Sequence, residues 1–272
     1  MKIFCKGKKM RNRLLKIARR IISDVEFSSE EEFNKYLKEH PDYREDTVFM
    51  VNGVRRQAPP KKKTENKPSV ASRRSSAQQS RNFKELHKYS LDEDITVRRS
   101  SAGNPHTHPS DLLRLSLEND DRMNVKISEN PSSGIKALNH LSKNENEKIR
   151  VSVAGHKHTS PETLSSLSED ESPKVRFTVS LNPHTPGDAL TKISKDKNYK
   201  IRENVAGNQS TPPETLTELS KDENESVIEK VALNPKTPKE TLEELSKHNS
   251  ELISFGARNT LNRLNGFDNS KY

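Results

Sequence analysis

The stretch that decides the fold is Asn234-Pro235-Lys236-Thr237-Pro238-Lys239-Glu240-Thr241-Leu242, followed by Leu245-Ser246, because similar stretches precede it along the chain. An anchoring asparagine or histidine recurs every 26 residues, at Asn104, Asn130, His156, Asn182, Asn208 and Asn234. Eight residues after each anchor stands a leucine: Leu112, Leu138, Leu164, Leu190, Leu216 and Leu242. A partial copy that contains Leu86 and Ser90 precedes them. A strict period of this length predicts a solenoid of about seven units.

Each unit carries the pattern of two short helices. Leucine or isoleucine stands eight and eleven residues after the anchor, which is the spacing of one helix face. Apolar residues at positions 19 and 23, such as Ile149 and Val153, predict a second helix. In Thr237-Pro238 we expect the threonine to cap the first helix and the proline to stand in its first turn. One unit has few apolar side chains to bury, so only stacking against neighbours can stabilise it.

These patterns predict an all-α fold with four parts. Residues 1–54 are expected to form a basic helical head, and residues 55–81 a disordered basic linker. Residues 82–264 are expected to form the solenoid, and residues 265–272 a disordered tail. We expect the linker to be disordered because it contains several Lys and Arg residues and almost no large apolar side chain that could be buried.

The positive charge is concentrated before the repeats. The chain holds 48 Lys and Arg against 39 Asp and Glu, a net charge of +9. Residues 1–81 have 21 basic and 10 acidic residues, a balance of +11, and residues 82–272 have 27 and 29, a balance of −2. Any attraction to a polyanion should therefore come mainly from the first part. The residues we expect to make such contacts are Lys8, Lys9, Arg11, Arg13, Arg19, Arg20, Lys61, Lys62 and Lys63.

The head contains three recognisable local signals. Residues 11–23 have the pattern of a basic amphipathic helix, which would also suit a mitochondrial presequence or an anionic membrane surface. Two overlapping capping boxes, Ser28 with Glu31 and Ser29 with Glu32, predict the start of a second helix. Thr47–Val51 is a short strand-like run. This arrangement resembles small opening modules of tailed-phage proteins, which implies a viral or phage origin.

The repeats resemble a known family. The copies at Asn182-Pro183-His184-Thr185-Pro186 and Asn234-Pro235-Lys236-Thr237-Pro238 are similar to the leucine-rich-repeat variant. That resemblance covers residues 82–264 and implies an α-helix paired with a short 3₁₀ helix, or a second α-helix, in a right-handed superhelix. The repeats also resemble HEAT-type repeats, in which an Asp and an Arg six residues apart form stacked ladders. The pairs with this spacing are Asp92/Arg98, Asp170/Arg176 and Asp196/Arg202, whereas Asn144/Arg150 lacks the acid and Asp222/Ile228 lacks the base.

The arginine column allows two interpretations. Arg98, Arg150, Arg176 and Arg202 recur at one repeat position. They would either track the phosphates of a polyanion or pair with acids in the ladder. The ladder is favoured because the repeats as a whole are slightly acidic.

No catalytic, metal or cofactor site is expected. His106, His158 and His184 share one repeat position, but stacked helices lie about 8–10 Å apart, too far for these histidines to share one ion. Cys5 is the single cysteine, which excludes a cysteine-ligated iron–sulfur cluster. The sequence has no glycine-rich phosphate loop and no nucleophile elbow. We therefore expect a protein that is not an enzyme.

Two functions follow as hypotheses. The first is a cytoplasmic scaffold that binds a partner protein on an extended concave solenoid surface. The residues expected to contact that partner are Lys148, Lys174, Lys200 and Glu225, in the second helices. The alternative is a nucleic-acid-associated protein anchored by residues 1–81. No apolar run approaches the roughly 20 residues of a membrane-spanning helix.

Overall fold

The computed structural model describes residues 26–29, 31–32, 35, 49–51, 54–56 and 67–266. The chain divides into two compact units, Met1–Pro68 and Ser69–Tyr272. In the described residues the second unit is entirely helical, and the first contains three short strands. The all-α solenoid predicted from the repeat period is confirmed.

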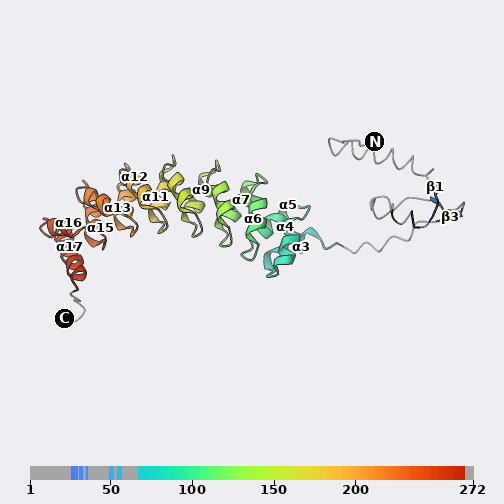
Figure 1. Ribbon diagram of the computed structural model, residues 1–272, viewed down its shortest axis with the longest axis horizontal. Coiled ribbons are helices and arrows are strands. Elements are labelled where there is room, and N and C mark those ends of the chain that lie inside the picture. The colour runs from blue at the N-terminus through green and yellow to red at the C-terminus, as the bar shows by residue number, and fades with distance from the viewer. Residues whose placement is uncertain are drawn as a thin grey trace. The chain divides into compact units, whose positions relative to one another are not determined.

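The second unit begins with α3 (Val70–Gln79), and seven helix pairs follow it in one continuous stack (Figure 1). The first helices of the pairs are α4 (Phe83–Ser90), α6 (Pro109–Ser116), α8 (Ile135–Leu141), α10 (Pro161–Leu167), α12 (Gly187–Ile193), α14 (Pro213–Leu219) and α16 (Lys239–Leu245). The second helices are α5 (Ile95–Ala102), α7 (Asp121–Glu129), α9 (Glu147–Gly155), α11 (Pro173–Leu181), α13 (Tyr199–Gly207), α15 (Glu225–Leu233) and α17 (Glu251–Leu264). Both helices of each described pair are α-helices, which settles the alternative of a 3₁₀ helix.

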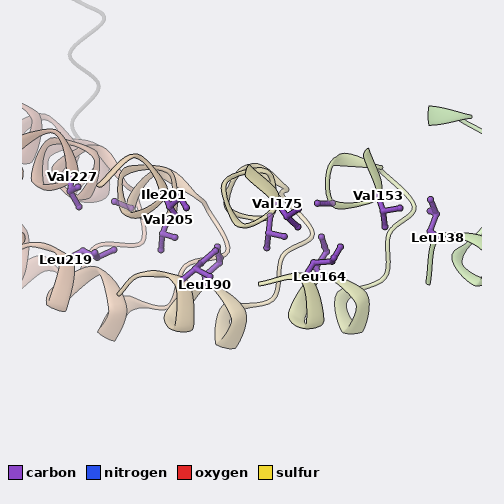
Figure 2. Packing of buried hydrophobic residues seen from close by; sticks show 14 of the residues in the cluster. Leu138, Val153, Leu164, Val175, Leu190, Ile201, Val205, Leu219 and Val227 are labelled. Carbon is purple, nitrogen blue, oxygen red and sulfur yellow. The ribbon is translucent and has the colours of Figure 1, made fainter. Parts of the chain in front are cut away.

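The core is a continuous apolar layer between the two rows of helices. Figure 2 shows Val153, Val175 and Val205 of the second helices facing Leu164 and Leu190 of the first helices. All five side chains are fully buried. Each second helix packs against the first helix of its own pair and against the second helices of its neighbours. The apolar periodicity of the sequence therefore corresponds directly to this layer.

The anchor residues tie each unit to the preceding one. Asn130 Nδ2 donates to the carbonyls of Ala102 and Asn104, and Asn130 Oδ1 accepts from the amide of Ser132. The same arrangement recurs at Asn208, whose amide reaches Ser180 and Asn182 of the preceding unit. The side chain is buried at both positions, so its hydrogen bonds satisfy backbone groups that water cannot reach.

The threonine of the Thr-Pro pairs has a different role from the one predicted. Thr237 Oγ1 donates to the carbonyl of Val231, 2.6 Å away, and the N-cap residue of α16 is Pro238. Thr185 makes the same bond to Val179, and Pro186 is the N-cap of α12. The threonine is buried beneath the turn, where its hydroxyl satisfies the end of the preceding helix.

The predicted linker is wrong over its last part. Helix α3 covers Val70–Gln79, within the stretch expected to be disordered, so the solenoid begins at Ser69. The helix buries Ala77 against α5, and Arg73 Nε forms an ion pair with Asp92 Oδ2 at 2.8 Å. A segment without large apolar residues is ordered here because a small side chain and a paired arginine suffice at the end of the stack.

The described residues of the head include a small sheet, in which two of the three strands were not predicted. The strands β1 (Glu26–Phe27), β2 (Phe49–Val51) and β3 (Val54–Arg56) pair in the order β1-β2-β3. β1 is parallel to β2, and β3 is antiparallel to it, with Val51 opposite Val54. The strand expected at Thr47–Val51 is confirmed over the residues of β2. The helix expected over residues 11–23 lies outside the described residues.

One predicted helix start in the head is visible. Ser29 Oγ accepts from the amide of Glu32 at 3.1 Å, as the capping box predicts. The carboxylate of Glu32 accepts from the amide and the hydroxyl of Ser28, so the reciprocal bond goes to the neighbouring serine.

Candidate functional site

An arginine ladder crosses the boundaries between units. Arg150 donates from Nε to Asp170 Oδ2 at 2.7 Å and from NH2 to Asp170 Oδ1 at 3.1 Å. Its NH1 group donates to the carbonyls of Asn144 and Glu145, each at 2.9 Å. The guanidinium therefore binds two carbonyls of its own unit and a carboxylate of the next unit.

The same arrangement recurs along the stack. Its further rungs are Arg98–Glu118, Arg176–Asp196 and Arg202–Asp222, and each joins residues 20 apart in sequence. The sequence pattern paired each arginine with the aspartate six residues before it, but that aspartate is not the ion-pair partner of the arginine. That residue offers its backbone carbonyl to the arginine, and its carboxylate pairs with the preceding unit.

The ion pairs hold both partners in their charged forms. Hydrogen bonding to Asp222 raises the pKa of Arg202 above its ordinary value. Burial opposes ionisation of Asp222, but the hydrogen bonds from Arg202 and from the amide of Asn224 lower the pKa of this carboxyl. The ladder thus accounts for the arginine column that could also have tracked phosphates.

The gaps in the ladder are matched. Where the arginine is replaced by Asn124, the position 20 residues later holds the neutral Asn144. Where it is replaced by Ile228, that position holds His248. A buried charge without its partner would be costly, and neither gap leaves one.

The predicted contact residues lie at the starts of the second helices, and all four are exposed. Lys174 Nζ lies 2.8 Å from Glu147 Oε1 of the preceding unit, and Lys148 Nζ lies 3.8 Å from Glu129 Oε1. Lys200 Nζ lies 2.9 Å from its near neighbour Glu203 Oε2. The lysines therefore form a row of surface ion pairs, with Glu225 in the same row.

A different surface, missed by the sequence reasoning, carries an apolar hollow. It has a volume of ≈ 740 Å³ and lies between the starts of α6, α8 and α10. Its apolar lining includes Pro109, Leu113, Ile135, Ala137 and Pro161. Ile135 is 57% exposed although it is a large apolar side chain. We call this surface the apolar hollow.

A glycine stands at one repeat position in the lining of the apolar hollow. Gly134 stands where other units have Pro186, Pro212 or Pro238. A Cβ atom at Gly134 would meet Pro109 Cβ at 3.3 Å, so the position lies close against α6. The units that contain α6, α8 and α10 all lack the Thr-Pro pair and have Thr107-His108, Ser133-Gly134 and Thr159-Ser160 in its place. This shared departure was the signal in the sequence that could have indicated the site.

Cationic and imidazole side chains surround the apolar hollow. Lys136, Lys157, His158 and His184 line it, and no acidic residue does. His158 Nδ1 lies 3.2 Å from the carbonyl of Ser133. The two histidines share a repeat position with His106, which is not among the lining residues.

Three further points concern metal ions, membrane spans and the polyanion-binding residues. No group of three or more His, Cys, Asp or Glu residues in the described part of the chain is placed to hold a metal ion. No helix within the described ranges is long and apolar enough to span a membrane. The residues proposed for polyanion binding, from Lys8 to Arg20 and from Lys61 to Lys63, lie outside the described residues.

Comparisons with known proteins address the fold. No protein-family model matches the chain, and no curated protein matches it. A solved structure described as a leucine-rich repeat variant with a novel repetitive motif has a TM-score of 0.52 and 20% identity, covering 72% of this chain and 78% of that chain. YibA of Escherichia coli has a TM-score of 0.37 and 16% identity, covering 74% and 99%.

An archaeal HEAT-like repeats protein from Thermococcus onnurineus NA1 has a TM-score of 0.35 and 11% identity, covering 74% of this chain and 99% of that chain. The first of these similarities, with a TM-score above 0.5, concerns the fold of the repeats. The repeat unit of this chain therefore has the fold of the leucine-rich repeat variant.

Proposed function

We propose that this protein is a non-catalytic scaffold that binds a partner protein on the surface of its solenoid. The observation that carries the proposal is the apolar hollow, with exposed Ile135 at the start of α8. An apolar concavity with a few polar groups is the usual form of a binding site. The occupant we propose is a peptide segment with an apolar side chain next to a carboxylate.

The chemistry of the apolar hollow supports that choice. Burying a leucine-sized side chain contributes about 1.5–3 kcal/mol. Lys136 and Lys157 beside the apolar lining would attract a carboxylate, and no acid lines the site to repel it. The lysine row that includes Lys174 is the second part of the proposed contact surface, because its exposed charges can select the orientation of a partner.

Selection from a phage-displayed random peptide library tests the proposal. We expect enriched peptides to contain a leucine or phenylalanine next to Asp, Glu or the terminal carboxylate. Ile135→Glu should weaken the best synthetic peptide at least tenfold in fluorescence anisotropy. Leu117→Glu is the matched control, because Leu117 is also 57% exposed but does not line the apolar hollow. An equal loss in both variants, or no enrichment, would contradict the proposal.

A second function is proposed for the N-terminal part, on the observation that residues 1–68 hold 18 basic and 10 acidic residues, a balance of +8. We propose that residues 1–68 associate with nucleic acid through phosphate contacts, in the cytoplasm, where a lone Cys5 would stay reduced. A salt titration of DNA and RNA binding by the full chain and by Ser69–Tyr272 tests it. Binding by the full chain alone, with steep salt dependence, is expected, and equal binding by both would overturn it.

A further inference from the structure

One unit of the ladder lacks its arginine and keeps the groups that an arginine would bind. In the neighbouring unit, Arg150 NH1 donates to the carbonyls of Asn144 and Glu145. The equivalent carbonyls one unit earlier belong to Glu118 and Asn119. Among the described residues, no side chain donates to either carbonyl.

The residue in the arginine's place has a side-chain oxygen without a partner. Asn124 is 2% exposed, and its Oδ1 atom has no hydrogen-bond partner in the described part of the chain. A buried acceptor without a donor costs about 1–3 kcal/mol. Among the described residues this is the one buried side-chain oxygen or nitrogen without a partner, so its donor must be water or a group of a bound molecule.

A pocket lies at the same place. It has a volume of ≈ 490 Å³ and is lined by Asn119, Asp121, Asn124, His140, Lys143, Asn144, Glu145 and Asn146. Asn119 has a φ of 52°, the left-handed conformation that is uncommon for residues other than glycine. The local backbone therefore departs from the regular repeat where the rung is missing.

We propose that this pocket binds the guanidinium group of an arginine side chain in a partner peptide. The guanidinium would take the position that Arg150 occupies in its own unit, donating to the carbonyls of Glu118 and Asn119 and to Asn124 Oδ1. Arginine fits these acceptors because its planar group presents several N–H donors in a fixed fork. The carboxylates of Asp121 and Glu145 line the pocket and outnumber the single lysine, Lys143.

The neighbouring rungs show that this chemistry works in this fold. Arg150, Arg176 and Arg202 each place NH1 within 2.7–2.9 Å of the carbonyl six residues earlier. The pocket differs in having Asn144 where those rungs have an aspartate. An arginine from outside would thus gain the carbonyl contacts without a full ion pair, and we expect weak, millimolar binding to a single residue.

The test uses acetyl-arginine amide as the probe on the full chain, followed by ¹H–¹⁵N NMR. We expect the Asn119 and Asn124 signals to shift saturably as the probe is added. The affinity obtained in the same way for acetyl-lysine amide should be at least tenfold lower. The double variant Asn124→Arg with Asn144→Asp would build the missing rung within the chain. It should weaken binding of the probe at least tenfold.

A matched control fills the other gap. Ile228→Arg with His248→Asp adds the same groups at the same repeat positions and should leave binding unchanged. Asn124→Leu is a second variant, which removes the acceptor without adding charge, and circular dichroism checks that each variant is folded. No saturable shift in the unaltered protein, or shifts that persist in both Asn124 variants, would overturn the proposal. Ile135→Glu should not alter these shifts, so this site can fail or succeed independently of the apolar hollow.

Discussion

The imidazole of His156 takes the place of an asparagine amide: its Nε2 lies 2.9 Å from the carbonyl of Asn130. The amide of His158 donates to His156 Nδ1 at 3.1 Å, so Nε2 carries the proton and the ring is neutral. Every other full unit has asparagine at this position. This single replacement adds a titratable group to a row of hydrogen bonds that is otherwise insensitive to pH.

We predict that acid destabilises the solenoid through His156. Burial lowers the pKa of His156 below its ordinary value of 6.5, so the unfolded state binds the proton more readily. The stability from the neutral ring is complete above pH 6.5 and is lost as the pH falls through the folded pKa. Thermal unfolding between pH 7.5 and 5 should show a smaller loss in His156→Asn than in the unaltered protein. Equal losses would show that other groups control this range.

Breaking one rung should destabilise the stack. Asp170→Ala leaves Arg150 largely buried without its bidentate carboxylate, although the arginine keeps two carbonyl partners and the exposed Glu171 carboxylate 3.5 Å from its NH2 group. We expect a loss of about 1–3 kcal/mol, between the values for buried and surface pairs. Urea unfolding measures it. The surface pair Lys174–Glu147 provides the comparison, and Lys174→Ala should have a clearly smaller effect.

Shortening a core side chain should lower the free energy of unfolding more than shortening a surface side chain. Leu190→Ala removes a fully buried side chain and is expected to lower the free energy of unfolding by about 2–5 kcal/mol. Leu181→Ala changes a leucine that is 56% exposed and should stay within about 0.5 kcal/mol. Urea denaturation of both variants checks the contrast, and similar values would mean that the units do not share one core.

Helix α3 should stabilise the end of the stack. A fragment of residues 82–272 lacks α3, so α5 loses its neighbour and Asp92 loses Arg73. This fragment is expected to unfold at a lower temperature than Ser69–Tyr272. Differential scanning calorimetry of the two fragments measures the difference, and identical transitions would show that α3 only lies against the stack without stabilising it.

The repeat period in the sequence was sufficient to predict the helix pairs and the core, because apolar spacing alone specifies both. Helix α3 could not be predicted in this way, since it buries only Ala77 and Arg73 against the stack. The ladder was predicted with the wrong partners, because a spacing of six does not show which unit receives the bond. The matched gaps at Asn124/Asn144 and Ile228/His248 contained the information, since only a spacing of 20 explains them.

The apolar hollow and the pocket beside Asn124 were harder to predict for a different reason. Each lies where residues depart from the repeat, at His108, Gly134 and Ser160 in one case and at Asn124 in the other. A residue that differs from the repeat pattern can be functionally neutral or can form part of a site, and the sequence alone does not distinguish these two cases. Only the surrounding side chains showed that one departure lies in a concave apolar surface and the other leaves a buried oxygen without a donor.

Because each rung joins residues 20 apart across a boundary, charge matching belongs to the junction between two units and not to either unit. Deleting residues 130–155 would therefore bring Asn124 against Asp170 and leave a carboxylate without its arginine. Deleting residues 156–181 would bring Arg150 against Asp196 and keep the charges balanced. A unit can therefore be lost or duplicated without leaving an unpaired charge only where the junctions on its two sides are both charged or both neutral.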